Sequence, residues 1–258
     1  MRAVRPGTGA VRWSGGRLML VSSPGREVGP IEGLIFDLGG TLDADGVPWA
    51  ERFRTLLAEA GLPGLTAGAL ESALEAGERA VLRHPRAAEL GLGEMVETHL
   101  SAQLGCLGAS ESGLVSRLRD RFVSETAGRL ADRRGLLERL AGRMPLAVVS
   151  NGCGNTRYLL AEAGLEPYFR AIVDSSRAGF WKPDPRIFEP ALSRLGAPRD
   201  RVAVVGDRLD RDVEAALAAG LRAVWVCGTR ALAAEGERPP GVHAVLRGVN
   251  ELDPEAVQ

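Results

Sequence analysis

Short runs of branched apolar residues alternate along the chain with stretches whose apolar positions have helical spacing. Helices are expected between the later runs, at about 154–164, 185–195 and 210–219. The runs that predict strands are GLIFD (33–37), PLAVVS (145–150), AIVDS (171–175), RVAVVGD (201–207), RAVWVCG (222–228) and, more weakly, HAVLRG (243–248). Strands that are apolar on both faces are typical of parallel sheets covered by helices. The pattern therefore predicts an α/β fold with helices on both faces of a parallel sheet.

The long segment between the first two strands contains no strand-like run. Apolar stripes with helical spacing recur at 49–60, 70–81, 92–104 and 112–130, and a further helix at about 132–142 leads back to the sheet. Four helices are too large an insertion for a simple crossover. We therefore expect a small helical domain at residues 46–130, inserted into a core formed by residues 31–45 and 131–258.

The first thirty residues differ from the rest of the chain. They contain five arginines and one glutamate, with many Gly, Ser and Pro, and their longest apolar run is LMLV. That run is too short for the apolar region of a secretory signal. We expect residues 1–30 to be a disordered tail, or to precede a true start at Met19.

Composition and charge exclude several classes of function. The chain is 45% hydrophobic and 25% charged, as in ordinary globular proteins, and its net charge is −1. No overall field attracts nucleic acid or a membrane surface, and no apolar run approaches the ~20 residues of a membrane helix. Three widely spaced cysteines indicate neither a disulfide framework nor a zinc site, which favours a reducing, cytoplasmic setting. A monomer and a homodimer both stay open.

The basic residues are unevenly distributed between the two types. Of 32 basic residues, Lys182 in FWKPDP is the one lysine. A strong bias toward arginine explains the rest of the set. A lysine persists where a compact ammonium is needed and a planar guanidinium fails, which favours a functional role for Lys182.

Polar residues follow the predicted strands at the edge where an open parallel sheet binds ligands. Asp37 ends the first strand, and Asp207 ends the fourth. The second strand ends on Ser150-Asn151-Gly152, Asp212 lies five residues after Asp207, and Lys182 follows the third strand. Each could be a turn or capping residue by itself. Together they predict one site at this edge.

These segments resemble the haloacid dehalogenase-like superfamily. DLGGT, SNG, KPDP and GDRLDRD occur in the order and spacing of its four motifs, and the resemblance covers residues 31 to about 250. It implies a Rossmann-like core. The inserted helices resemble the cap domain of the subgroup that contains phosphoglycolate-type phosphatases and dehalogenases.

The resemblance implies a role for each residue at the sheet edge. Asp37 would attack phosphorus to form an aspartyl-phosphate, with Lys182 offsetting charge and Ser150 donating a hydrogen bond to the phosphoryl group. Thr41, Asn151 and Gly152 would also contact the substrate. Mg²⁺ would be held by Asp37, Asp207 and the backbone carbonyl of Gly39, with Asp212 behind them to orient the metal or Lys182.

Gly39 departs from the pattern of the family's phosphatases. They usually carry an aspartate two residues after the nucleophile, which protonates the leaving oxygen and then activates water. Glycine keeps the carbonyl and deletes the acid/base. Its replacements could be Asp43, Asp45, or one of the histidines His84 and His99, although each of these also fits a structural role.

Three functions follow from the motifs. The first is a Mg²⁺-dependent phosphatase or phosphotransferase for a small phosphorylated metabolite. The second is a 2-haloacid dehalogenase, whose halide leaves without a proton; such enzymes need no metal and typically lack a motif like GDRLDRD, which favours phosphoryl chemistry here. The third is a weakly active or inactive protein that binds a phosphorylated ligand or a partner.

Overall fold

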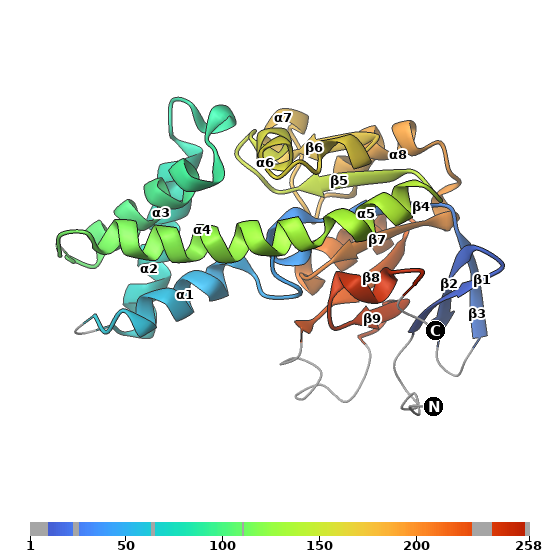
Figure 1. The fold of residues 1–258 in the computed structure, drawn as a ribbon, viewed down its shortest axis with the longest axis horizontal. Helices are drawn as coiled ribbons and strands as arrows, with labels where there is room; N and C mark the ends of the chain where they lie inside the picture. The colour runs from blue at the N-terminus through green and yellow to red at the C-terminus, as the bar shows by residue number, and fades with distance from the viewer. Residues whose placement is uncertain (1–9, 23–25, 63–64, 110, 229–238, 256–258) are drawn as a thin grey trace.

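A six-stranded parallel sheet forms the centre of the protein (Figure 1). The computed structural model describes residues 10–22, 26–62, 65–109, 111–228 and 239–255. The strand order is β6-β5-β4-β7-β8-β9. The bounds are β4 Gly33–Phe36, β5 Leu146–Ser150, β6 Ala171–Asp174, β7 Val202–Gly206, β8 Arg222–Val226 and β9 Ala244–Leu246. All six predicted strands are present, and the predicted fold class is confirmed.

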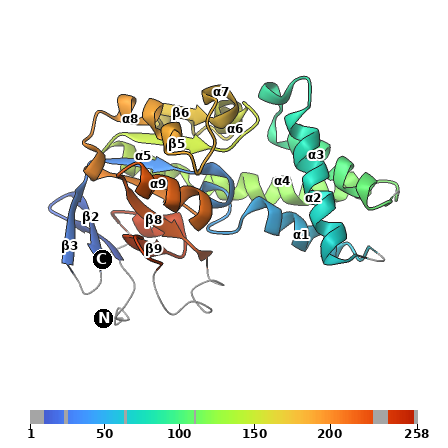
Figure 2. The same ribbon diagram turned by 180° about the vertical axis from the view of Figure 1, so that it is seen from behind.

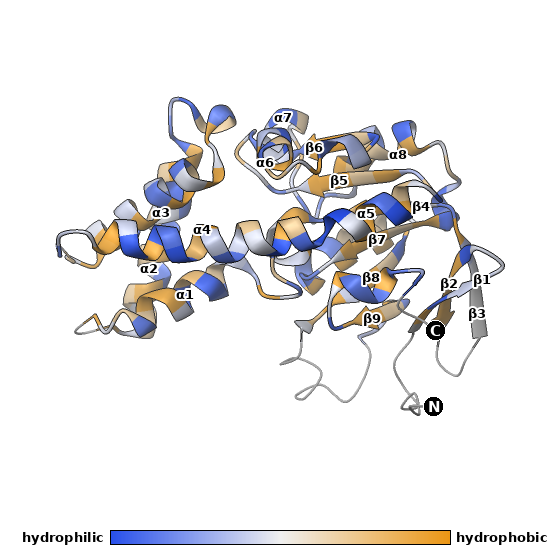
Figure 3. Cartoon of the chain, viewed as in Figure 1, coloured by the Kyte–Doolittle hydropathy of each residue, from blue (hydrophilic) through white to orange (hydrophobic). Residues whose placement is uncertain are grey.

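Side chains alternate between the two faces of the sheet, and each face has its own apolar core. Leu34 and Phe36 of β4 belong to a cluster with α5 (Arg134–Ala141) and α6 (Thr156–Glu162). Ile35 belongs to a second cluster with α8 (Glu189–Leu195) and α9 (Glu214–Ala218). The short helix α7 (Ser175–Ala178) follows β6. Figure 3 shows the strands as apolar bands between these helices. Burial on both faces explains why the strands are continuous apolar runs.

Of the α-helices described between β4 and β5, four extend away from the sheet (Figure 2). They are α1 Trp49–Glu59, α2 Ala67–Leu82, α3 Leu92–Cys106 and α4 Leu114–Asp132, and together they are called the helical unit. Their apolar stripes pack against one another, as the spacing predicts. The domain boundaries at residues 46 and 130 stay predictions. No helix in the described ranges combines the length and apolarity that a membrane span requires.

The N-terminal segment corrects one expectation. The described residues between 10 and 31 form an antiparallel meander of β1 Ala10–Ser14, β2 Arg17–Ser22 and β3 Arg26–Ile31, where a disordered tail, or residues preceding a true start at Met19, were expected. Leu18 and Leu20 are fully buried, and Trp13 Nε1 donates to Leu252 O at 3.0 Å. Burial of alternate residues against the core holds this sheet in place. Residues 1–9 and 23–25 lie outside the described residues.

Candidate active site

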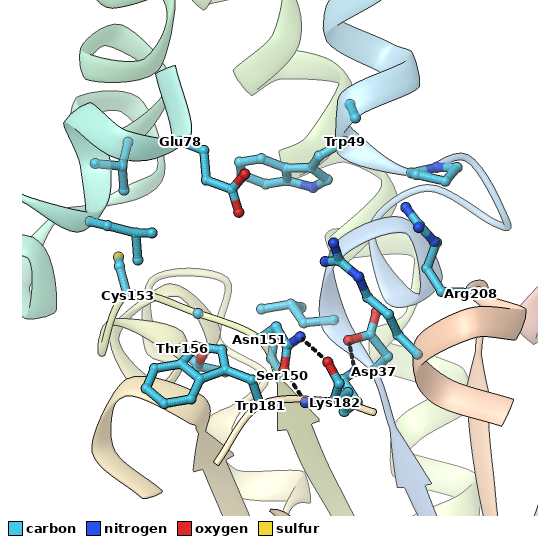
Figure 4. Close-up of a pocket in the computed structure, with 18 of the residues that line it drawn as sticks. Asp37, Trp49, Glu78, Ser150, Asn151, Cys153, Thr156, Trp181, Lys182 and Arg208 are labelled. Carbon is cyan, nitrogen blue, oxygen red and sulfur yellow. Dashed lines mark hydrogen bonds and ion pairs between the residues drawn. The ribbon is translucent and has the colours of Figure 1, made fainter. Parts of the chain in front are cut away.

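The single lysine sits in a socket made by three acceptors. Lys182 Nζ donates to Asp37 Oδ1 at 2.5 Å, to Asp212 Oδ1 at 2.5 Å and to Val149 O at 3.0 Å (Figure 4). Its side chain is 2% exposed. The two carboxylates raise the pKa of Lys182 although burial alone would lower it, so the ammonium stays charged. All three N–H donors are used, which fixes the position of the charge.

Asp37, Asp207 and Asp212 form a buried carboxylate cluster. One oxygen from each can be chosen so that all lie within 4.8 Å of one another. Burial raises the pKa of Asp37 from 3.8 to about 6, with Lys182 opposing that shift. Burial, and then the charges of Asp37 and Asp212, raise the pKa of Asp207 to about 8. The cluster therefore holds more negative charge than Lys182 offsets.

The donor set fits a hard divalent cation. Asp207 Oδ2 is buried and has no hydrogen-bond partner among the described residues. An acceptor buried in this way is costly unless it binds something. Oxygen ligands and surplus negative charge are what Mg²⁺ requires.

Two neighbours position this cluster. Asn151 clamps the backbone of Lys182: its Nδ2 donates to Lys182 O at 3.0 Å, and its Oδ1 accepts from Lys182 N at 2.8 Å. Thr41 is buried and donates its hydroxyl to Asp207 Oδ1 at 3.0 Å. Thr41 thus contacts Asp207, and it is not among the residues that line the cavity described below. Both residues were expected to contact the substrate directly, and of the two Asn151 lines the cavity.

Ser150 and Gly152 reach the same space. Both line the cavity next to Asp37. The Ser150 hydroxyl forms no hydrogen bond within the described part of the chain and stays available. A Cβ at Gly152 would stand 2.4 Å from Asp174 Oδ2, so that position has no room for a side chain.

Glycine occupies positions 39 and 40 for different structural reasons. Gly40 has φ 98°, and a Cβ there would meet Asp207 Oδ2 at 2.4 Å, so position 40 requires glycine. Gly39 has φ −80° and ψ 112°, which any residue adopts. A Cβ at position 39 would lie 3.4 Å from Trp49 Nε1, an ordinary contact. The backbone does not exclude a side chain at 39, and the Trp49 indole occupies the space beside it.

The proposed substitutes for the missing acid are placed elsewhere or held in other roles. Asp43 accepts from Gly40 N and Trp49 Nε1, and it does not line the cavity. Asp45 is paired with Arg129 and Arg133, away from the cavity.

The two histidines are not placed to replace the acid either. His84 accepts from Arg86 N and does not line the cavity. His99 does line it, but burial lowers its pKa to about 4, so its ring is neutral at pH 7.

A cavity of about 610 Å³ opens above Asp37 between the sheet edge and the helical unit. Several of its lining residues were not among the predicted site residues: Trp49, Glu78, Trp181, Arg208 and Arg211. Figure 4 places Glu78 and Trp49 across the cavity from Asp37 and Lys182. Helical stripes show which residues are apolar, but not which of them face a second domain.

Comparison with known proteins supports the motif assignment. Residues 31–220 match the family model for haloacid dehalogenase-like hydrolases. A phosphoserine phosphatase of Thermus thermophilus is 42% identical over 84 residues, which cover 32% of this chain and 34% of the relative. The (S)-2-haloacid dehalogenase 2 of a Pseudomonas species is 31% identical over 122 residues, covering 46% and 52%. These alignments span a third to a half of the curated relatives.

A solved structure extends the likeness over the fold. The magnesium-bound HAD-hydrolase YfnB of Bacillus subtilis has a TM-score of 0.51 and 24% identity, covering 86% of this chain and 96% of that one. At this identity the likeness shows the fold alone.

Proposed function

This chain belongs to the haloacid dehalogenase-like hydrolase family, and from that premise we propose that it is a Mg²⁺-dependent phosphatase or phosphotransferase for small phosphorylated metabolites. The observation that carries the proposal is the charge at the strand ends. Three buried carboxylates lie together, and two of them are paired with one ammonium. A divalent cation would bring the buried charge to zero, whereas metal-free carbon–halogen chemistry would leave it unbalanced.

The metal would be held by Asp37, Asp207 and the carbonyl oxygen of Gly39. When bound, it would supply positive charge opposite the transferred phosphoryl group. Asp212 would hold Lys182, to which it is hydrogen bonded.

The protein's own residues would carry the reaction in two displacements. An Asp37 carboxylate oxygen attacks phosphorus and forms an aspartyl-phosphate, while the bond from phosphorus to the leaving oxygen breaks. Lys182 holds the Asp37 side chain and offsets its charge. The free Ser150 hydroxyl donates to a phosphoryl oxygen. Water, or another hydroxyl acceptor, then attacks phosphorus and releases Asp37.

Acetyl phosphate is the direct test, since its leaving group needs no protonation. We expect hydrolysis with Mg²⁺ and none after chelation. Mg²⁺-independent hydrolysis at an equal rate would refute the metal's role.

A second candidate is a 2-haloacid dehalogenase. It is favoured by the similarity to a haloacid dehalogenase and by the absence of an acid at Gly39, since halide leaves unprotonated. Chloride release from 2-chloropropionate without metal would support this function over the first.

A further inference from the structure

The wall of the cavity that faces the sheet edge is mostly apolar, with Glu78 as its acidic residue. The helical unit contributes Trp49, Phe53, Leu74, Val81 and Met95 to it. His99 adds a neutral ring stacked on Phe53, with centroids 4.3 Å apart and planes 14° apart. A body placed above Asp37 therefore meets rings and aliphatic groups, which suits a flat, apolar ligand better than a polyol.

The mouth of the cavity exposes large apolar side chains. Among the described residues, three large hydrophobic side chains are about half exposed: Leu82 at 51%, Tyr158 at 51% and Trp181 at 49%. Leu82 and Trp181 line the cavity, and Tyr158 does not. Trp181 directly precedes Lys182, so an indole flanks the reacting centre. Exposed apolar surface beside a cavity marks a ligand-binding site.

Once Asp207 holds the metal, no group near Asp37 among the described residues is ready to protonate a leaving oxygen. Lys182 Nζ already donates to Asp37, Asp212 and Val149 O, which uses all three of its N–H groups. Asp212 accepts from Lys182 and from Arg208 N. The Cys153 thiol is directed to Ala87 O and Asn155 Oδ1. Glu78 is exposed and lies across the cavity in Figure 4.

We propose that the substrates are aryl phosphates, meaning phosphate esters of acidic hydroxyl groups carried on flat apolar rings. This inference rests on the proposed function and names its substrate class. The apolar wall binds the ring, and the acidic hydroxyl makes a leaving group that departs without a proton.

The two steps balance without an added acid or base. Asp37 bonds to phosphorus as the phosphorus–oxygen bond to the ring breaks, and the electron pair leaves on the phenolate. Water then attacks phosphorus, and the bonding pair returns to the Asp37 carboxylate. Both protons of that water leave on dihydrogen phosphate.

Four substrates, assayed with the full chain and Mg²⁺, separate the need for a ring from the need for an acidic leaving group. Phenyl phosphate has a ring and an acidic leaving group. Cyclohexyl phosphate keeps the size but not the acidity, acetyl phosphate keeps the acidity but not the ring, and ethyl phosphate has neither. We expect kcat/KM for cyclohexyl phosphate to be about 10²–10⁴-fold below that for phenyl phosphate. We expect KM for acetyl phosphate to be at least about tenfold higher than for phenyl phosphate.

Each contrary result has a separate meaning. Equal rates with cyclohexyl and phenyl phosphate would show that a proton donor exists and would overturn the inference. Turnover of acetyl phosphate with an equal or lower KM would overturn the role of the apolar wall. Failure of all four substrates would refute the proposed phosphatase function itself.

Variants at the mouth provide an independent test. Leu82→Gln and Trp181→Gln should each lower the ratio of kcat/KM for phenyl phosphate to that for acetyl phosphate about tenfold. Tyr158→Gln is the matched control, because it removes an equally exposed ring outside the cavity. An unchanged ratio in both test variants, or an equal fall in the control, would contradict the inference.

Discussion

The indole nitrogen of Trp49 lies 3.4 Å from the point where a Cβ on Gly39 would stand. Gly39 places no side chain at this position, and a tryptophan from the helical unit lies beside it. Asp37, Lys182 and the carboxylate cluster lie together at the same strand ends. Under the proposed function, this site would transfer a phosphoryl group without a group at position 39 to move a proton.

Restoring the acid should widen the range of substrates. Gly39→Asp should raise kcat/KM for cyclohexyl phosphate by up to about 10²–10⁴-fold, because an acid could then protonate the alkoxide. Gly39→Asn is the matched control, having the same shape without an acidic proton. Since Trp49 adjoins this position, Gly39→Asp combined with Trp49→Phe should gain at least as much. No gain in either folded protein would show that another residue already supplies the proton.

The missing base should make the second step slow. Water attack on the aspartyl-phosphate lacks a general base, whereas formation of the intermediate from an aryl phosphate needs no acid. Rapid mixing with 4-nitrophenyl phosphate should therefore show a burst of nitrophenolate of about one equivalent per site. The burst should vanish in Gly39→Asp if the new carboxylate accelerates hydrolysis. A linear time course in the wild-type protein would contradict this order of rates.

We expect that even arginine cannot replace Lys182 without loss of activity. Its three donors converge from one nitrogen on Asp37, Asp212 and Val149, which a planar guanidinium cannot reproduce. Lys182→Arg should lower kcat at least about 10²-fold. Lys182→Met should destabilise the metal-free fold by roughly 3–5 kcal/mol, measured by urea unfolding, because the carboxylates lose their partner.

The control for these variants is an exposed ion pair. Arg199→Lys changes a guanidinium that is paired with Glu189 at the surface. Such pairs contribute about 0–1 kcal/mol, so activity and stability should change little. Full activity in Lys182→Arg would show that the three acceptors around Lys182 Nζ do not require an ammonium.

Mg²⁺ binding should be coupled to pH. Without metal, the pKa values of Asp37 and Asp207 are raised from 3.8 to about 6 and about 8, so the folded protein binds protons that the unfolded chain has lost. These two groups therefore lower the free energy of unfolding as the pH rises from about 4 to about 8. Mg²⁺ displaces the protons and should raise Tm more at pH 8 than at pH 5.

Thermal unfolding with and without Mg²⁺ at the two pH values measures this coupling. Saturation at a hundred times Kd corresponds to about 2.7 kcal/mol, or several degrees in Tm. Asp207→Asn is the control and should lose the Mg²⁺ effect. An equal Tm gain at both pH values would contradict the proposed ligand set.

The sequence predicted the sheet well because its strands are buried on both faces. The apolar run ending at Asp207 shows both the strand and the edge at which its carboxylate lies. The meander was missed because residues 1–30 were interpreted from composition. The alternation around Leu18 and Leu20 and the Gly15-Gly16 turn were local signals of a hairpin.

The residues of the cavity wall could not be predicted from the sequence, for a different reason. Trp49 lies in an apolar helical stripe and was expected to pack inside the helical unit. It does contact Phe53 and Phe122, yet it also covers Gly39 and lines the cavity. Which part of a stripe faces a second domain depends on how the two pack, and one chain's periodicity carries no information on that.

The most direct test of the central claim is the rate of acetyl phosphate hydrolysis with Mg²⁺ by Asp37→Asn, measured beside the wild-type protein. Asparagine keeps the shape of the side chain and removes its nucleophilic oxygen. We expect turnover by the wild-type protein and its loss in Asp37→Asn, with the fold unchanged by circular dichroism. Turnover by Asp37→Asn at the wild-type rate would show that Asp37 is not the nucleophile.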